Sequence, residues 1–185
     1  MNRTIRLLVA LAVLCGLSQA PVATAAERWL LVDTGDRTLS VMEGEHLLQA
    51  FDNISIGRGG TSRTRYVGGQ ETPLGTYRIS SLRQETRYHR FFGINYPSLQ
   101  DALRAYEAGR INAAELAAIR AAQESGREPP FSTPLGGNIG IHGLGTGDPD
   151  IHADFNWTDG CIALTNEQAD QLAKWVRLGM TVVIH

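Results

Sequence analysis

The segment NWTDGCIALTNEQ, residues 156–168, places a cysteine between a glycine and a short apolar run. The apolar residues after Cys161 predict a buried β-strand. Thr165 and Gln168 have the spacing of a capping box, which predicts a helix over 166–178. The segment therefore predicts a loop, a strand and a helix in succession, with the thiol at the start of the strand.

The composition is typical of one soluble globular domain. The chain has 185 residues, of which 43% are hydrophobic and 19% are charged. The formal net charge of −2 gives no sign of the basic surface that nucleic-acid binding requires. We therefore expect no nucleic-acid partner.

The first residues are typical of a secretory signal peptide. Two arginines in MNRTIR precede the apolar run LLVALAVLCGL, and ATA at 23–25 supplies small residues for cleavage. The apolar run is short for a membrane span, and a retained N-terminal anchor is the alternative. We expect cleavage of residues 1–25, a single domain over 26–185, and no membrane span in the mature protein. Loss of Cys15 leaves Cys161 as a lone cysteine, either a buried apolar residue or a reactive thiol.

Alternating apolar residues and turn residues predict a mainly β fold, in the form of a sandwich or a barrel-like sheet. The segment ERWLLVDTGDRTLSVMEG at 27–44 predicts a β-hairpin. Further strands are expected in HLLQAFDNISIGRGG (46–60), TPLGTYRISSL (72–82), RFFGINYP (90–97), NIGIH (138–142) and MTVVIH (180–185).

Residues 98–125 instead have helical spacing, with Gly109 between two helices and Asn112 as a cap for the second. The expected apolar faces consist of Leu99, Leu103 and Tyr106 in the first helix and Leu116, Ile119 and Ala122 in the second. We expect an inserted helical hairpin that forms a lid or a cleft wall, with a plain packing element as the alternative. Long loops are expected at 126–137 and 143–157.

A nucleophilic cysteine needs a base, donors for an oxyanion and access to solvent. His142 ends the NIGIH strand, where alternation places Ile139 and Ile141 on one face and the imidazole on the other. His152 in the following loop is the second candidate base. Gly160 permits a backbone twist that aims two successive amides at one point, which makes them candidate oxyanion donors. Two strands ending at one edge would bring the imidazole and the thiol together.

IHG at 141–143, followed by T-x-G-C-I at 158–162, resembles the signature of the L,D-transpeptidase (YkuD-type) catalytic domain family. TPLGTY at 72–77 is similar to that family's turn and strand before the active site. The resemblance extends from Trp29 to the C-terminus, with the helical hairpin as a variable insertion. It implies a mainly β, YkuD-like sandwich or barrel-like fold with a helix after the cysteine.

The same resemblance implies a periplasmic, cell-wall-associated enzyme that acts on peptidoglycan stem peptides, with a wall-attached lipoprotein as a further partner. Cys161 would attack the carbonyl of the L-centre of diaminopimelate and form a thioester, which an amine or water resolves. His142 would be the base, oriented by the carbonyl of Gly143. The amides of Gly160 and Cys161 would hold the oxyanion, and Thr158 would hydrogen-bond within the loop. We expect no cofactor and no metal.

Two positions depart from the family pattern. The family often has histidine at the position of Asp159 and arginine at the position of Ala163. A carboxylate beside the sulfur raises the pKa of the thiol and favours imidazolium at His142. These departures bear on donor and acceptor specificity. Candidates to replace the missing cation are Arg58, Arg63, Arg65 and Arg87.

Three alternatives stay open. A hydrolase of the same fold would be an L,D-carboxypeptidase, an endopeptidase or an amidase that releases wall-linked protein. A zinc peptidase would use His142, His152 and Cys161 as ligands, although closely spaced ligand pairs and a helical HExxH are absent from the sequence. A non-catalytic wall-binding module would simply bury the thiol.

Overall fold

The computed structural model describes residues 26–185, so the expected signal peptide at 1–25 lies outside the described residues. The strands are β1 (Arg28–Asp33), β2 (Thr38–Glu43), β3 (His46–Asp52), β4 (Thr61–Ser62), β5 (Thr72–Pro73), β6 (Gly75–Thr86), β7 (His89–Ile94), β8 (Gly140–Gly143), β9 (Ile162–Leu164) and β10 (Thr181–Ile184). The helices are α1 (Leu99–Glu107), α2 (Ala113–Glu124), α3 (Pro149–Asp154) and α4 (Asn166–Leu172).

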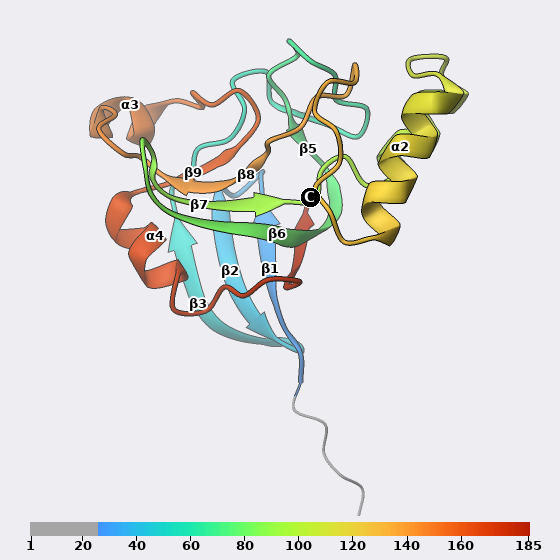
Figure 1. Ribbon diagram of the computed structural model, residues 1–185. Helices are drawn as coiled ribbons and strands as arrows, with labels where there is room; N and C mark the ends of the chain where they lie inside the picture. The colour runs from blue at the N-terminus through green and yellow to red at the C-terminus, as the bar shows by residue number, and fades with distance from the viewer. Residues whose placement is uncertain (1–25) are drawn as a thin grey trace, which may run out of the picture.

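Eight strands form one mixed sheet in the order β3-β2-β1-β10-β6-β7-β8-β9. The long strand β6 pairs with β10 through its first residues and with β7 through the rest, so β6 to β9 cross over β1 to β3 (Figure 1). Ser55, just after β3, bridges to Ala163 of β9 at the opposite end of the order. The sheet therefore curves back on itself, and the expected mainly β, barrel-like fold is confirmed.

The main core fills the inside of this curved sheet. Alternate residues of the strands face it, among them Leu30, Val182, Ile141 and Ile162, all of which are fully buried. Helix α4 covers the core and contributes Leu172. Because β8 and β9 each turn an isoleucine inward, the neighbouring residues of both strands face the other way.

Helices α1 and α2 are inserted between β7 and β8, and in Figure 1 α2 stands beside the sheet. They form a second small core with the loop that follows them, consisting of Ala102, Ala105, Ile111, Ile119 and Leu135. The predicted hairpin and the predicted face of α2 are therefore present.

The apolar face predicted for α1 is wrong. Leu103 and Tyr106 are 37% and 45% exposed, whereas Ala102 and Ala105 are buried. The helix begins with a capping box in which Ser98 and Asp101 satisfy each other's backbone amides. Asp101 is thereby fixed on the inner side, and the helix packs through its small residues.

Two helix boundaries also differ from expectation. The loop predicted at 143–157 contains α3, which Asp148 caps and which has a proline in its first turn. Helix α4 has the expected capping box but ends at Leu172, well before residue 178. The next turns pack against the sheet instead, where the indole Nε1 of Trp175 donates to Gln49 at 2.7 Å. Over residues 26–185, no helix has both the length and the apolar character that crossing a bilayer requires.

Candidate active site

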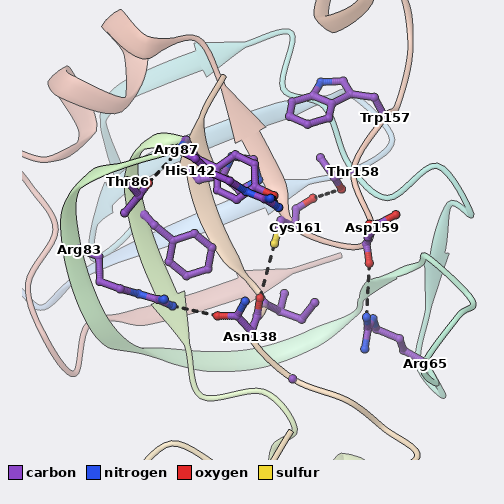
Figure 2. A pocket seen from close by; sticks show the side chains of 14 residues that line it. Arg65, Arg83, Thr86, Arg87, Asn138, His142, Trp157, Thr158, Asp159 and Cys161 are labelled. Carbon is purple, nitrogen blue, oxygen red and sulfur yellow. Dashed lines mark hydrogen bonds between the residues drawn. The ribbon is translucent and has the colours of Figure 1, made fainter. Parts of the chain in front are cut away.

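Strands β8 and β9 lie side by side in parallel, with Ile141 opposite Ile162 and His142 opposite Ala163. Both isoleucines belong to the main core. His142 follows Ile141 within β8, and Cys161 directly precedes Ile162, the first residue of β9, so both side chains point away from the face that the isoleucines occupy. Figure 2 shows the imidazole and the sulfur on the wall of the same pocket.

The pocket has a volume of about 490 Å³. Its lining consists of Arg65, Arg83, Thr86, Arg87, Tyr88, Phe91, Gly137, Asn138, Ile139, His142, Trp157, Thr158, Asp159 and Cys161. None of its three arginines forms an ion pair with a carboxylate of residues 26–185. Its single acidic residue, Asp159, pairs with Arg58 at 2.7 Å. The pocket wall is therefore positively charged.

Aromatic rings surround the His142 imidazole. Tyr88 stacks on it with centroids 4.3 Å apart, Phe91 lies parallel to it at 6.0 Å, and Trp157 meets it edge-on at 5.9 Å. His142 is only 2% exposed. This burial lowers its pKa to about 4, so the ring is neutral at pH 7.

The tautomer of His142 follows from one contact. Its Nδ1 lies 2.7 Å from the carbonyl oxygen of Gly143. A carbonyl oxygen can only accept a hydrogen bond, so Nδ1 carries the proton and Nε2 keeps its lone pair. A neutral imidazole with a free Nε2 can accept a proton.

The Cys161 thiol donates to the backbone carbonyl of Asn138, with Sγ and oxygen 3.8 Å apart. Burial raises its pKa to about 11, against the lowering effects of a backbone hydrogen bond from Gly140 and of the Arg65 charge; the charge of Asp159 raises it by less than Arg65 lowers it. Asp159 therefore raises the pKa of the thiol, as expected, but burial raises it more. The expectation that Asp159 favours an imidazolium at His142 is wrong, because burial holds the pKa of His142 low. At rest the two groups are a neutral thiol and a neutral imidazole.

The loop before Cys161 is held by Thr158. Its hydroxyl donates to the carbonyl of Cys161 at 2.6 Å and accepts from the amide of Gly160 at 3.1 Å. The Gly160 amide is thus engaged within the loop, whereas the Cys161 amide donates to no acceptor in the described part of the chain. Of the two amides expected to face an oxyanion, one is free.

Gly160 is required by both its backbone and its surroundings. Its φ is +123°, and a Cβ there would lie 2.6 Å from the carbonyl oxygen of Glu71. Arg65 ties the same loop down by donating to the carbonyls of Glu71 at 2.9 Å, Leu135 at 2.8 Å and Asp159 at 3.3 Å. Arg65 is 7% exposed, so its cation lies in the wall behind the loop.

Of the four arginines proposed to replace the missing cation, Arg65 and Arg87 line the pocket. Arg58 is engaged by Asp159, and Arg63 lies outside the lining. Sequence reasoning missed several residues that line the pocket, namely Arg83, Tyr88, Phe91, Asn138 and Trp157. Phe91 and Asn138 had a usable signal, since each belongs to a predicted strand, and in the structure Phe91 pairs with His142.

His152, the second candidate base, lies on α3 and does not line the pocket. Its Nδ1 accepts a hydrogen bond from the indole Nε1 of Trp157 at 3.2 Å. Across residues 26–185, no three His, Cys, Asp or Glu side chains are grouped closely enough to hold a metal ion. The three residues of the zinc alternative therefore do not form a site.

A family model described as the YkuD L,D-transpeptidase catalytic domain matches residues 27–184. The chain belongs to the YkuD family. A comparison of this YkuD chain with curated proteins found no match.

Solved structures share the fold of this YkuD chain. The helical cell shape determining protein Pgp2 from Campylobacter jejuni is 20% identical with a TM-score of 0.58, over 88% of this chain and 49% of that one. Bd1075 from Bdellovibrio bacteriovorus is 20% identical with a TM-score of 0.55, over 87% and 48%. An Enterococcus faecium L,D-transpeptidase (C442S mutant) is 11% identical with a TM-score of 0.50, over 87% and 50%. The matched region spans about half the length of each of these structures.

Proposed function

We propose that this YkuD chain is an L,D-transpeptidase that modifies peptidoglycan through a thioester on Cys161. The observation that carries the proposal is the shared pocket of Cys161 and His142, in which the imidazole is neutral with a free Nε2. A buried thiol with a raised pKa becomes a nucleophile only when a base removes its proton as it attacks. His142 is the base that the pocket offers.

In the first step the thiol turns from the Asn138 carbonyl toward His142 and gives its proton to Nε2. The sulfur electron pair forms a bond to the carbonyl carbon of the diaminopimelate L-centre, and the π pair of that carbonyl moves onto oxygen. The free amide of Cys161 donates to this oxyanion. The carbonyl of Gly143 accepts from Nδ1–H, and so stabilises the imidazolium that forms.

In the second step the oxyanion re-forms the carbonyl and the bond to the nitrogen of the terminal D-alanine breaks. The imidazolium of His142 gives its proton to that nitrogen, so D-alanine leaves as an amine and Cys161 holds the acyl group. An amine of a second stem peptide then attacks the thioester, which releases the thiol and leaves a cross-link. Water in place of the amine would give hydrolysis.

The charge of the pocket supports a substrate with carboxylates, as peptidoglycan stem peptides have. Arg87 lies close enough to His142 for its charge to lower the pKa of the imidazole, and its guanidinium stacks on Tyr88. In the terminal D-alanine only the Cα separates the nitrogen, which takes a proton from His142, from the carboxylate. This carboxylate therefore lies near His142 during the reaction. Arg87 is therefore proposed to bind this terminal carboxylate.

We propose that this activity takes place outside the cytoplasm, in the cell wall of the periplasm, a location that membership of the YkuD family supports. A signal peptide at 1–25 would be consistent with this location. The wall-attached lipoprotein stays a prediction that no described contact tests.

The test is incubation of the purified protein with tetrapeptide muropeptides, with and without an amine acceptor, followed by mass analysis. Cross-linked or exchanged products with loss of D-alanine are expected, and Cys161→Ala should form none. Products of hydrolysis alone, even with excess acceptor, would favour the L,D-carboxypeptidase or endopeptidase alternative. Processing that survives in Cys161→Ala would refute the cysteine mechanism, whereas binding without any processing would favour the wall-binding module.

A further inference from the structure

The oxyanion in the proposed mechanism has only one backbone donor in the described chain. The amide of Gly160 donates to Thr158, which leaves the amide of Cys161. Oxyanion sites in acyl-transfer enzymes use preorganised donors, and the loss of one donor has a large effect on rate. A second donor near the sulfur would complete the site.

Asn138 is in a position to supply it. The residue precedes β8, its backbone carbonyl lies 3.8 Å from the Cys161 sulfur, and its side chain is part of the pocket wall. It is exposed, so a substrate can reach it. Figure 2 shows Asn138 between the guanidinium of Arg83 and the sulfur of Cys161.

Arg83 determines which way the amide of Asn138 is turned. Its Nη2 lies 3.0 Å from the Asn138 side chain, and a guanidinium can only donate, so the atom facing it is Oδ1. The Nδ2 group therefore points away from Arg83, and it has no acceptor among residues 26–185. The guanidinium itself lies over the ring of Phe91, with Cζ 4.2 Å from the centroid.

We propose that Nδ2 of Asn138 is the second oxyanion donor and that Arg83 is the positioning residue that aims it. This inference rests on the proposed function. As sulfur bonds to the carbonyl carbon, the π pair moves onto oxygen, and Nδ2–H and the Cys161 amide donate to that oxygen. Asn138 transfers no proton, because the thiol proton goes to His142.

A purely structural role for Asn138 is the competing explanation. Its φ is +55°, a left-handed conformation in which asparagine is more common than other residues with a side chain. Asn138→Gly keeps this backbone accessible and removes the amide group. Asn53 is a matched control, because it is also exposed and has a φ of +58°. Asn53→Gly therefore makes the same change away from the pocket.

Two reactions of the same thiol separate the roles. A carbapenem acylates cysteine through a tetrahedral oxyanion, whereas iodoacetamide alkylates it by displacement at a saturated carbon and forms none. Asn138→Gly should slow single-turnover acylation of Cys161 by about 10²-fold, the usual effect of losing one such donor. Alkylation by iodoacetamide should stay within about twofold, and Asn53→Gly should alter neither rate.

Arg83 is tested in the same assay. Arg83→Met should slow acylation by a smaller factor, and it should add nothing in the Asn138→Gly background, because an absent amide cannot be aimed. Arg83→Lys should restore part of the rate, since an ammonium also donates to Oδ1. Additive losses from Arg83→Met and Asn138→Gly would overturn the positioning role.

The remaining outcomes are distinct. Acylation of Asn138→Gly at the wild-type rate would overturn the inference while leaving the proposed function intact. Parallel losses in acylation and alkylation would mean that Asn138 only shapes the loop, which also overturns it. A wild-type thiol that is alkylated but acylated by neither carbapenem nor tetrapeptide would refute the proposed function itself.

Discussion

The buried imidazole of His142 makes the stability of the protein sensitive to acid. Its pKa falls from the ordinary value of 6.5 to about 4 because the folded chain removes it from water. Between these values the unfolded state binds a proton that the native state does not. The free energy of unfolding therefore decreases as pH falls through 6.5 and continues to decrease until about pH 4.

The size of the effect follows from the shift. One pKa unit corresponds to about 1.4 kcal/mol, so the full shift is worth about 3 kcal/mol, of which about 2 kcal/mol is lost between pH 7 and pH 5. His142→Gln removes the titrating group and keeps an amide N–H that can donate to the Gly143 carbonyl. It should lose about 2 kcal/mol less than the wild type over this interval, whatever its absolute stability.

The measurement is urea unfolding of both proteins at pH 7 and pH 5, with comparison of the two pH-dependent losses. His46→Gln is the control, because this exposed histidine on β3 lies elsewhere and His142 is still present. That control should keep the wild-type loss. Equal losses in His142→Gln and the wild type would show that the imidazole is not held neutral by burial, and the base assignment would lose its physical basis.

Three further predictions concern the loop and the pocket. A pKa of about 11 leaves about 10⁻⁴ of Cys161 as thiolate at pH 7, so iodoacetamide alkylation should rise about tenfold per pH unit up to pH 10; a plateau near pH 8 would contradict the raised pKa. Gly160→Ala should lower the free energy of unfolding by at least about 2 kcal/mol more than Gly179→Ala, because Gly179 also has a positive φ but has open space where a Cβ would lie. Equal losses would exclude a clash between the new Cβ at position 160 and the carbonyl oxygen of Glu71. Arg87→Gln should reduce kcat/KM about tenfold for a tetrapeptide with a free terminal carboxylate but little for its C-terminal amide, whereas Arg78→Gln should affect neither; equal losses for both substrates would exclude a carboxylate contact.

Features that depend on neighbours along the chain were predictable from the sequence. The Thr165–Gln168 capping box and the Asn112 cap each join residues two or three positions apart, so their spacing alone identifies them. Strand alternation placed His142 on the face opposite Ile141 for the same reason. Where helix α4 ends was not predictable, because packing of the following turns against the sheet decides it.

By itself, the sequence determined the mainly β fold, the strand that contains His142, the strand that follows Cys161, and membership of the YkuD family, through local spacing and an ordered motif. Only the tertiary structure decided the charge state of His142, because burial by rings from other segments sets its pKa. It likewise decided which arginines line the pocket of the thiol. Arg65 contacts the carbonyl of Asp159, 94 positions away, and Arg83 contacts the side chain of Asn138, 55 positions away. Such contacts form only when the sheet curves and brings distant strands together, and no pattern along the chain records them.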